Sequence, residues 1–303
     1  MTLYYDSDDV QLHHGDALTV ARTLPDGMAR TIVTSPPYFG LRDYGEDGQI
    51  GAESSVGQYV ARIIELFREL RRVLADDGTL WLNLGDSFAS GGRTSYAIDP
   101  KLPERAHLRP VSDLPAKNLL GIPWRVALAL QEDGWVLRSD IIWHKPNAMP
   151  ESVTDRPTKS HEYVFLLSKR PDYFYDAAAI AEDAEKGSAG SSFTTGKTAV
   201  HGLGRSSTVE RAEDGKRNKR DVWTVSTVSF PGSHFAVYPP ELIRPCIRAG
   251  SEPGDIVLDP FSGSGTTGAV ATFEGRRYVG IDLNRDYLDL SLRTRFQQPT
   301  LPW

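Results

Sequence analysis

Residues 255–268 read DIVLDPFSGSGTTG, and this stretch decides the fold. Its beginning has the composition of a short buried strand, the glycines that follow predict a tight turn, and a helix is expected from about Thr266. Glycines in such a turn let the backbone approach a ligand closely, and the exposed amides favour a negative group. We expect the ligand to contact this turn, which comprises Asp259, Pro260, Phe261, Ser262, Gly263, Ser264, Gly265 and Thr266.

Asp282 ends the next predicted strand, about 20 residues beyond the first of these glycines. A carboxylate in that position can accept hydrogen bonds from both hydroxyls of a ribose, so turn and carboxylate together indicate an adenosine-bearing ligand. The glycine spacing also matches the dinucleotide fingerprint G-x-G-x-x-G, and a tight turn without any ligand is a further alternative. Only one helix is expected after Asp282, which leaves no room for the rest of a dinucleotide-binding domain. The N-terminal strands must therefore complete the sheet, and the cofactor half comes last.

The rest of the chain alternates predicted strands with predicted helices. Apolar residues recur at helical spacing over residues 58–74, and Asp77-Gly78 is expected to end that helix. Residues 161–168 and 173–175 are typical of a strand pair. The alternation predicts one α/β domain, residues 1–303, with a mostly parallel sheet and helices on both faces. Further strands are expected at residues 10–13, 30–34, 79–84, 135–143, 255–259 and 277–281, and further helices at 17–24, 122–131, 240–249 and from 285.

The sequence Ser-Pro-Pro-Tyr, residues 35–38, follows directly on the predicted strand 30–34. Pro36 and Pro37 fix their φ angles and remove two backbone donors. What remains is a rigid row of acceptors, the Ser35 hydroxyl and the backbone carbonyls, with the ring of Tyr38 beside them. A turn that merely ends the strand is the alternative, but this set suits the binding of an NH₂ group carried by an aromatic ring.

The exocyclic amine of cytosine or adenine is a poor nucleophile, because its lone pair is delocalised into the ring. Acceptors bonded to both N–H groups can pull the nitrogen toward a pyramidal state and direct the lone pair at an electrophilic methyl group. Duplex DNA hides this nitrogen, so the base must be flipped out and held by stacking, for which Tyr38 is the natural platform. A sulfonium methyl donor could lie near Phe261 and gain cation–π stabilisation. We therefore predict Ser35, Pro36, Pro37 and Tyr38 as the catalytic turn.

Two polar insertions interrupt the alternation, at residues 86–118 and 184–225. The net charge of -6 does not indicate a nucleic-acid binder, so DNA would have to be contacted by a local positive surface. Both insertions carry basic residues that could contact phosphates, and solvated loops are the alternative. Asp86, which follows a predicted strand, could contact the substrate. The basic residues are Arg93, Lys101, Arg105, His107 and Arg109 in the first insertion, and Lys197, Arg205, Arg211, Lys216, Arg217, Lys219 and Arg220 in the second.

The single cysteine, Cys246, excludes an internal disulfide and a cysteine-built zinc site, and we expect no bound metal. Cys246 lies in a predicted helix, which favours a core thiol over a catalytic nucleophile. The N-terminus lacks the basic start and apolar segment of a secretory signal, and no apolar run reaches the roughly 18 residues of a membrane span. We therefore expect a cytoplasmic protein, associated with the nucleoid when it is bound to DNA.

With these motifs in this order, the chain resembles the β-class DNA amino-methyltransferases over almost its whole length. Residues 34–38 resemble the family's catalytic motif, and residues 257–267 (VLDPFSGSGTT) resemble its cofactor loop. The family also has the catalytic motif first and the cofactor motif last. Further blocks of the family are similar to residues 59–84, 143–147 (WHKPN), 156–157, 161–163 (HEY) and 233–239.

The resemblance implies a doubly wound, seven-stranded methyltransferase sheet, circularly permuted with the catalytic half first, and with inserted DNA-recognition loops. It implies S-adenosylmethionine as the cofactor and in-line methyl transfer without a covalent enzyme intermediate. Asp16 matches the turn beside the cofactor adenine, and His234 lies in the segment that packs over its methionine end. Residues 184–225 match the place of the target-recognition region. Double-stranded DNA is the implied partner, and a cognate restriction endonuclease would act separately.

The serine at the first position of the turn, Ser35, favours the N4 of cytosine, since family members with Asp or Asn there usually methylate adenine N6. An adenine-N6 methyltransferase is the first alternative. An NAD-dependent oxidoreductase built on the glycine fingerprint would leave the Ser-Pro-Pro-Tyr turn unexplained. A catalytically silent DNA-binding protein would have no need of that turn. RNA or a protein glutamine stays open as the substrate, and monomer and homodimer are both open.

Overall fold

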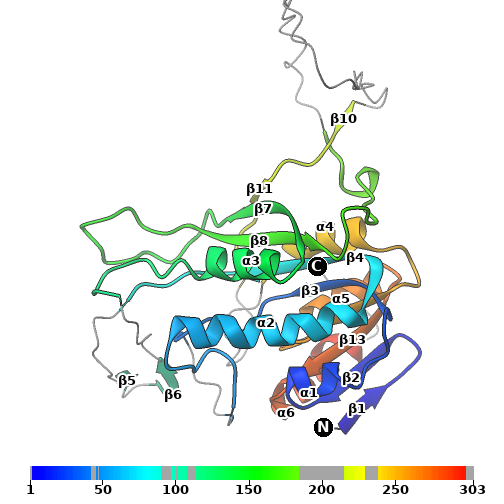
Figure 1. Ribbon diagram of the computed structural model, residues 1–303, viewed down its shortest axis with the longest axis horizontal. Helices are drawn as coiled ribbons and strands as arrows, with labels where there is room; N and C mark the ends of the chain where they lie inside the picture. Colours follow the sequence, from blue (N-terminus) through cyan, green and yellow to red (C-terminus); the bar gives the residue numbers. More distant parts are fainter. Residues whose placement is uncertain are drawn as a thin grey trace, which may run out of the picture.

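The computed structural model describes residues 2–41, 46, 48–89, 114–183, 215–228 and 238–297, and the backbone of 97–99 and 102–107. Within these ranges one sheet dominates, with helices on both of its sides (Figure 1). Seven of its nine strands run in the same direction, and only the first edge strand and residues 161–168 run against them. In spatial order the strands are β1 (Thr2–Asp6), β2 (Val10–His14), β13 (Arg277–Asp282), β12 (Ile256–Asp259), β3 (Ala29–Thr34), β4 (Leu74–Leu84), β8 (His161–Ser168), β7 (Val136–His144) and β11 (Val222–Thr224).

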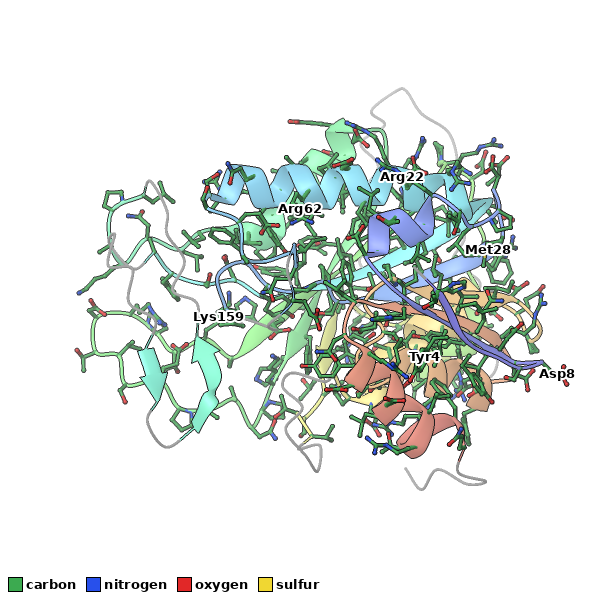
Figure 2. The ribbon with its side chains drawn as sticks, turned by 90° about the horizontal axis from the view of Figure 1, so that it is seen from below. Tyr4, Asp8, Arg22, Met28, Arg62 and Lys159 are labelled. Carbon is green, nitrogen blue, oxygen red and sulfur yellow. The ribbon has the colours of Figure 1, made fainter. Side chains whose placement is uncertain are left out.

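The helices divide between the two faces of the sheet, each with its own hydrophobic core. Alternate residues of β4 supply both cores, because side chains alternate along a strand: Leu80 and Leu82 face one, Trp81 the other. Figure 2, which views the molecule from below, shows the first layer along one side, where Arg22 and Arg62 are labelled. That layer comprises α1 (Ala17–Ala21), α2 (Val56–Val73) and α3 (Ile122–Glu132), and the second comprises α4 (Pro240–Gly250), α5 (Thr266–Phe273) and α6 (Arg285–Ser291).

Smaller elements lie outside these layers. Residues Leu292–Phe296 extend α6 as a π-helical turn. One short antiparallel pair lies within residues 86–118, and a second joins a strand just before residues 184–225 to a strand inside them. The pairs are β5 (Ala97–Asp99) with β6 (Leu102–His107) and β9 (Glu182–Asp183) with β10 (Lys216–Arg217), and a 3₁₀ turn, η1, spans Ala178–Ile180.

The predicted doubly wound α/β fold is confirmed, with two short strands more than the seven expected. The two additional strands are the edge strands β1 and β11. Neither is covered on both faces, so their sequences lack the strong hydrophobic pattern that would have predicted them. Helix α2 agrees with its prediction because its pattern is strong: Ser55 caps it by accepting from the Gln58 amide at 3.2 Å, and apolar residues recur on one face. The circular permutation stays a prediction.

Two local predictions are wrong. Asp77-Gly78 does not separate helix from strand, because β4 begins at Leu74 and these residues lie in an irregular stretch of it. Residues 173–175 do not form a strand; the Phe174 amide donates to the Asp77 carbonyl instead. Strand β8 pairs with β4 and β7, so both of its edges are already used.

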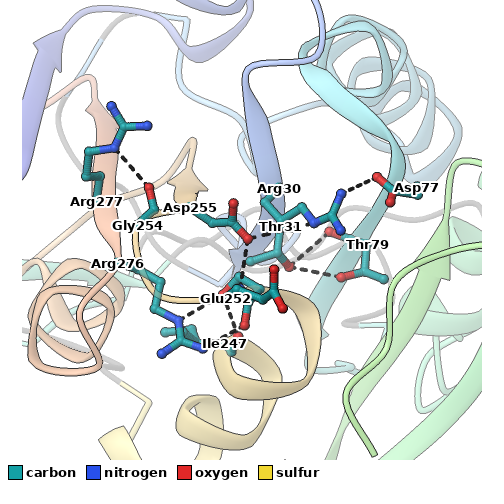
Figure 3. A network of polar contacts seen from close by, with 11 residues as sticks. Arg30, Thr31, Asp77, Thr79, Ile247, Glu252, Gly254, Asp255, Arg276 and Arg277 are labelled. Atoms are coloured by element: carbon teal, nitrogen blue, oxygen red, sulfur yellow. Dashed lines mark hydrogen bonds and ion pairs between the residues drawn. The ribbon is translucent and has the colours of Figure 1, made fainter.

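A polar network joins the amino ends of β3, β4 and β12 (Figure 3). The Thr31 hydroxyl lies 3.0 Å from the Thr79 hydroxyl and donates to the Thr79 carbonyl at 3.1 Å. Arg30 pairs with Asp77, and its Nε lies 3.8 Å from Asp255. Because this end of the sheet is closed by side chains of the protein itself, the opposite, carboxyl ends of the parallel strands are where a ligand can bind.

Candidate active site

A cavity opens at the carboxyl ends of β3, β12 and β13, where the two motif-bearing turns meet. Ser35 and Pro37 line it from the turn after β3. The predicted cofactor residues that line it come from three separate segments of the chain, which only the fold brings together. They are Asp16, Pro260, Phe261, Ser262, Gly263, Ser264, Thr266 and Asp282.

The glycine turn is held against the end of β13 by hydrogen bonds. The Ser262 amide donates to the Ile281 carbonyl at 2.8 Å, and the Gly263 amide donates to Asp282 Oδ2 at 2.7 Å. Gly265 caps α5 with φ 77°, and a Cβ there would lie 2.8 Å from Ser291 Cβ. Gly265 does not line the cavity, so its place in the motif is explained by backbone conformation and close packing.

Burial raises the pKa of Asp282 to about 7, and the negative charges of Asp259 and Glu46 act in the same direction. Amide donors oppose this shift: Gly263 on one carboxylate oxygen and Asn284, at 2.8 Å, on the other. Each oxygen has a second acceptor position in addition to its amide. Asp282 can therefore accept the two hydroxyls of a ribose when it is ionised.

Asp259 was predicted to contact the cofactor, but the structure places it beneath the cavity, where it is 1% exposed. Oδ1 accepts from the Thr34 hydroxyl at 2.6 Å and the Phe261 amide at 3.0 Å. Oδ2 accepts from the Thr267 hydroxyl at 2.6 Å and the Tyr238 hydroxyl at 3.2 Å. With two donors on each oxygen the carboxylate is fully engaged. Asp259 thus ties the end of β3 to the cofactor turn.

The Ser-Pro-Pro-Tyr turn presents its serine to the cavity and its tyrosine to the protein. Ser35 Oγ lies 3.5 Å from the Tyr38 hydroxyl, which in turn donates to Glu162 Oε2 at 2.7 Å. The Pro37 carbonyl accepts from the Tyr59 hydroxyl at 3.0 Å, so one of the predicted acceptors is already used. The Ser35 hydroxyl is therefore the side-chain acceptor that this turn offers to a ligand.

Pro36 is buried and Tyr38 does not line the cavity. The ring of Tyr38 packs against Gly85, where a Cβ would lie 2.5 Å from Tyr38 Cε2. Burial and the charge of Glu162 raise the pKa of the Tyr38 phenol well above its usual value, so Tyr38 keeps its proton. Its predicted stacking role stays a prediction, and His234 lies outside the described residues.

Several lining residues were missed from the sequence. Glu46, Gly48, Gln49 and Ile50 come from the loop after the catalytic turn, whose glycine-rich sequence has no period. Arg62 on α2 holds this loop by donating to the Gly48 carbonyl at 2.9 Å and the Gln49 carbonyl at 3.3 Å. The others had a signal nearby in the sequence. Ala17, Leu283 and Asn284 lie within two residues of predicted site residues, Tyr238 belongs to the family block 233–239, and Tyr287 lies in the first turn of α6.

Among the described residues that line the cavity, Asp16, Glu46 and Asp282 carry carboxyl groups, and none carries a cationic side chain. When these carboxyl groups are ionised, they favour a positively charged ligand over one that carries a pyrophosphate. The cavity therefore suits a ligand with positively charged groups better than a dinucleotide, although the spacing of the glycines matches the dinucleotide fingerprint. This observation weakens the case for an NAD-dependent enzyme.

The family model described as DNA methylase, N6_N4_Mtase, matches residues 29–293, which include both turns and every strand between them. The chain belongs to this DNA methylase family. The Type II methyltransferase M.Cfr9I of Citrobacter freundii is 53% identical over 284 residues, 93% of this chain and 86% of that protein. The oxidoreductase alternative is therefore wrong.

Two solved structures share the fold of this methylase. The PvuII DNA methyltransferase (cytosine-N4-specific) superposes with a TM-score of 0.67 at 19% identity, over 98% of this chain and 90% of that one. A DNA modification methylase of Thermus thermophilus, complexed with S-adenosyl-L-methionine, gives 0.59 at 23% identity, over 93% and 91%. S-adenosylmethionine is the cofactor of this family, and the cavity fits it: Asp282 suits its ribose, and the carboxylates suit its sulfonium and ammonium groups.

The basic residues predicted to contact DNA are described only in part. Arg217 and Arg220 pair with Glu182 at 3.0 and 2.8 Å, and Lys216 pairs with Asp183 at 2.6 Å. These ion pairs reduce the positive potential at this end of residues 184–225. Lys197, Arg205 and Arg211, and the side chains of Arg93, Lys101, Arg105, His107 and Arg109, lie outside the described residues.

Other sequence-based hypotheses concern single residues. Asp86 accepts the amides of Gly121 and Ile122, both at 3.1 Å, and so caps α3 instead of facing the cavity. Cys246 is fully buried, and its thiol donates to the Leu242 carbonyl at 3.7 Å, as expected of a core residue. In the described part of the chain, no cluster of three or more His, Cys, Asp or Glu could hold a metal, and no helix is long and apolar enough to cross a membrane.

Proposed function

We propose that this methylase is a site-specific Type II enzyme that transfers a methyl group from S-adenosylmethionine to the N4 of a flipped cytosine in duplex DNA. One observation carries the proposal: Ser35 and the cofactor turn line the same cavity. A base whose amine reaches Ser35 is therefore next to the cofactor. The similarity to M.Cfr9I, a Type II methyltransferase, supports site-specific action on DNA.

In the proposed mechanism, the chain positions the amine and leaves the reactivity of the methyl group to the cofactor. The bound cofactor supplies an electrophilic methyl group on a sulfonium. The Ser35 hydroxyl accepts one N–H of the amine, and a backbone carbonyl of the turn accepts the other. Because both N–H bonds are then directed at the protein, the nitrogen lone pair points away from it. The aromatic face of Phe261, which lines the cavity, stabilises positive charge there.

We favour cytosine over adenine because the residue in the first position of the turn is Ser35, as in the family members that usually methylate cytosine N4. A carboxylate or amide in this place is typical of adenine-N6 enzymes, and the PvuII methyltransferase, which shares the fold, is specific for cytosine N4. The adenine-N6 reaction would use the same fold and cavity. We expect double-stranded DNA as the partner and a cognate endonuclease that acts separately. We expect the protein in the bacterial cytoplasm, where both are found.

The Ser35→Ala variant tests the role of the turn. Cofactor affinity, measured by calorimetry, should change little, because the hydroxyl faces the amine rather than the ribose. Turnover with DNA should fall about 100-fold or more, the usual cost of losing one polar group aimed at the reacting atoms. Ser54→Ala is the matched control, since Ser54 is exposed and bonds to Gln58 at 2.7 Å outside the cavity. Unchanged turnover in Ser35→Ala would remove Ser35 from the mechanism.

A further inference from the structure

Glu162 on β8 contacts the catalytic turn although it does not line the cavity. Its Oε2 accepts the Tyr38 hydroxyl at 2.7 Å, and its Oε1 is paired with Lys145. The side chains of Glu162 and Lys145 are only 18% and 17% exposed, so this ion pair is largely shielded from water. Lys145 is fixed in turn, with its ammonium 4.1 Å from the centre of the Trp143 ring.

Asn83 on β4 has its orientation set by the same group. Its Nδ2 donates to the Tyr163 carbonyl at 3.0 Å and to Glu162 Oε2 at 3.3 Å. The amide oxygen is consequently the atom that faces Tyr38, at 3.2 Å from the hydroxyl. Both neighbours therefore present acceptors to the Tyr38 hydroxyl, which must act as the donor.

The direction of this bond determines the direction of the next one. Because the Tyr38 hydroxyl donates its hydrogen bond to Glu162, its oxygen has only lone pairs to offer Ser35. The Ser35 hydroxyl, 3.5 Å away, is then oriented with its proton toward Tyr38 and its lone pairs toward the cavity. An amine can only be received by lone pairs. A hydroxyl that is free to rotate would spend part of its time with its proton aimed at the amine.

We propose that Glu162 is a positioning residue, which acts through the Tyr38 hydroxyl to keep Ser35 in its acceptor orientation. This inference rests on the proposed function, since an amine substrate gives the orientation its purpose. Glu162 itself touches neither the base nor the cofactor. The carboxylate sets the polarity of a chain of two hydroxyls, and Lys145 compensates its charge inside the protein.

The Glu162→Gln variant weakens this polarity with little change of volume. Lys145 would bind the amide oxygen, so the amide NH₂ would face the Tyr38 oxygen. Only the neutral, longer acceptor Asn83 Oδ1, at 3.2 Å, would then compete with Ser35 for the Tyr38 proton. We expect kcat to fall roughly 10- to 100-fold, the range for a hydrogen bond to a charged group. KM for DNA and the Kd of S-adenosylmethionine should stay within about twofold, the scatter between independent sites.

A double-mutant cycle with Tyr38→Phe distinguishes positioning from general damage. Without the Tyr38 hydroxyl there is no link to Ser35, so adding Glu162→Gln to Tyr38→Phe should change kcat by less than about twofold. Glu274→Gln is the matched control: Glu274 is 9% exposed and pairs with Arg244 and Arg248, away from the catalytic turn. It should lower the melting temperature and leave kcat unchanged.

The outcomes separate the inference from the proposed function. If the wild-type protein methylates DNA and Glu162→Gln lowers kcat only when Tyr38 is present, the inference holds. If Glu162→Gln leaves kcat unchanged, or lowers it equally with and without the Tyr38 hydroxyl, the inference is overturned while the proposed function stands. If the wild-type protein transfers no methyl group to DNA, the proposed function fails and the inference falls with it.

Discussion

Cofactor affinity should rise between pH 6 and pH 8, because Asp282 must lose its proton before it can accept two ribose hydroxyls. Burial raises the pKa of this carboxyl to about 7. With that pKa, the ionised fraction rises from roughly one-tenth at pH 6 to roughly nine-tenths at pH 8. If the ionised form is the one that binds, the affinity rises roughly tenfold over this range.

Asp282 should also make the free energy of unfolding depend on pH, and here the effect is a decrease as the pH rises. An unfolded aspartate has a pKa near 3.9, so between about pH 4 and pH 7 the native protein binds the proton more readily than the unfolded chain. The stability that this proton provides is complete below about pH 4 and is lost as the pH rises through 7. The loss is at most about 4 kcal/mol, and less in practice because the Asp282 side chain is only half-buried.

Titration calorimetry with S-adenosylmethionine at a series of pH values measures the first effect. Asp282→Asn is the control, because titration of the ligand's own amino group is common to both proteins and cancels in the comparison. Urea unfolding of both proteins at pH 6 and pH 8 measures the second effect, and the stability of Asp282→Asn relative to the wild type should increase with pH. A wild-type affinity with the same pH dependence as that of Asp282→Asn would refute the role assigned to Asp282.

Three further predictions concern other parts of the site. Gly265→Ala should lower the free energy of unfolding by about 1–3 kcal/mol in urea titrations, because its φ is 77° and a Cβ would meet Ser291 at 2.8 Å; equal stability would contradict this packing. Arg62→Ala should weaken cofactor binding in calorimetry by about tenfold, because it removes the hydrogen bond that holds the loop at Gly48. A tenfold change is about what one hydrogen bond from a charged group contributes. Cys246→Ala should retain methyl transfer. Iodoacetamide should not label the Cys246 thiol of the native protein, because burial raises the pKa of that thiol. Rapid labelling would show instead that α4 opens.

Sequence patterns predicted the parts of the fold that bury most apolar surface. The helical period of α2 and the β-branched run of β3 are local signals, and both elements lie within two residues of their predicted bounds. The edge strand β11 is short and half-exposed, so its pairing with β7 depends on tertiary contacts that no local pattern records. The same holds for residues 173–175, which are held by bonds to distant parts of the chain.

The site was predictable where one motif supplies both the backbone turn and its side chains. Ser35 and Phe261 line the cavity as expected. Asp259 was predicted wrongly as a ligand contact, because the residue type in a motif does not show whether the side chain faces the ligand or is buried in hydrogen bonds between two turns. Glu46 had no sequence signal, since its place depends on the loop that Arg62 holds.

Methyl transfer to DNA, followed by analysis of the nucleosides, tests the central claim most directly. Purified protein would be incubated with tritium-methyl S-adenosylmethionine and mixed unmethylated genomic DNA, and the digested nucleosides identified by mass spectrometry. We predict label in N4-methylcytosine. Label in N6-methyladenine would keep the fold and the cavity but contradict the assignment of Ser35 to cytosine. No labelled nucleoside, despite measured cofactor binding, would contradict DNA as the substrate.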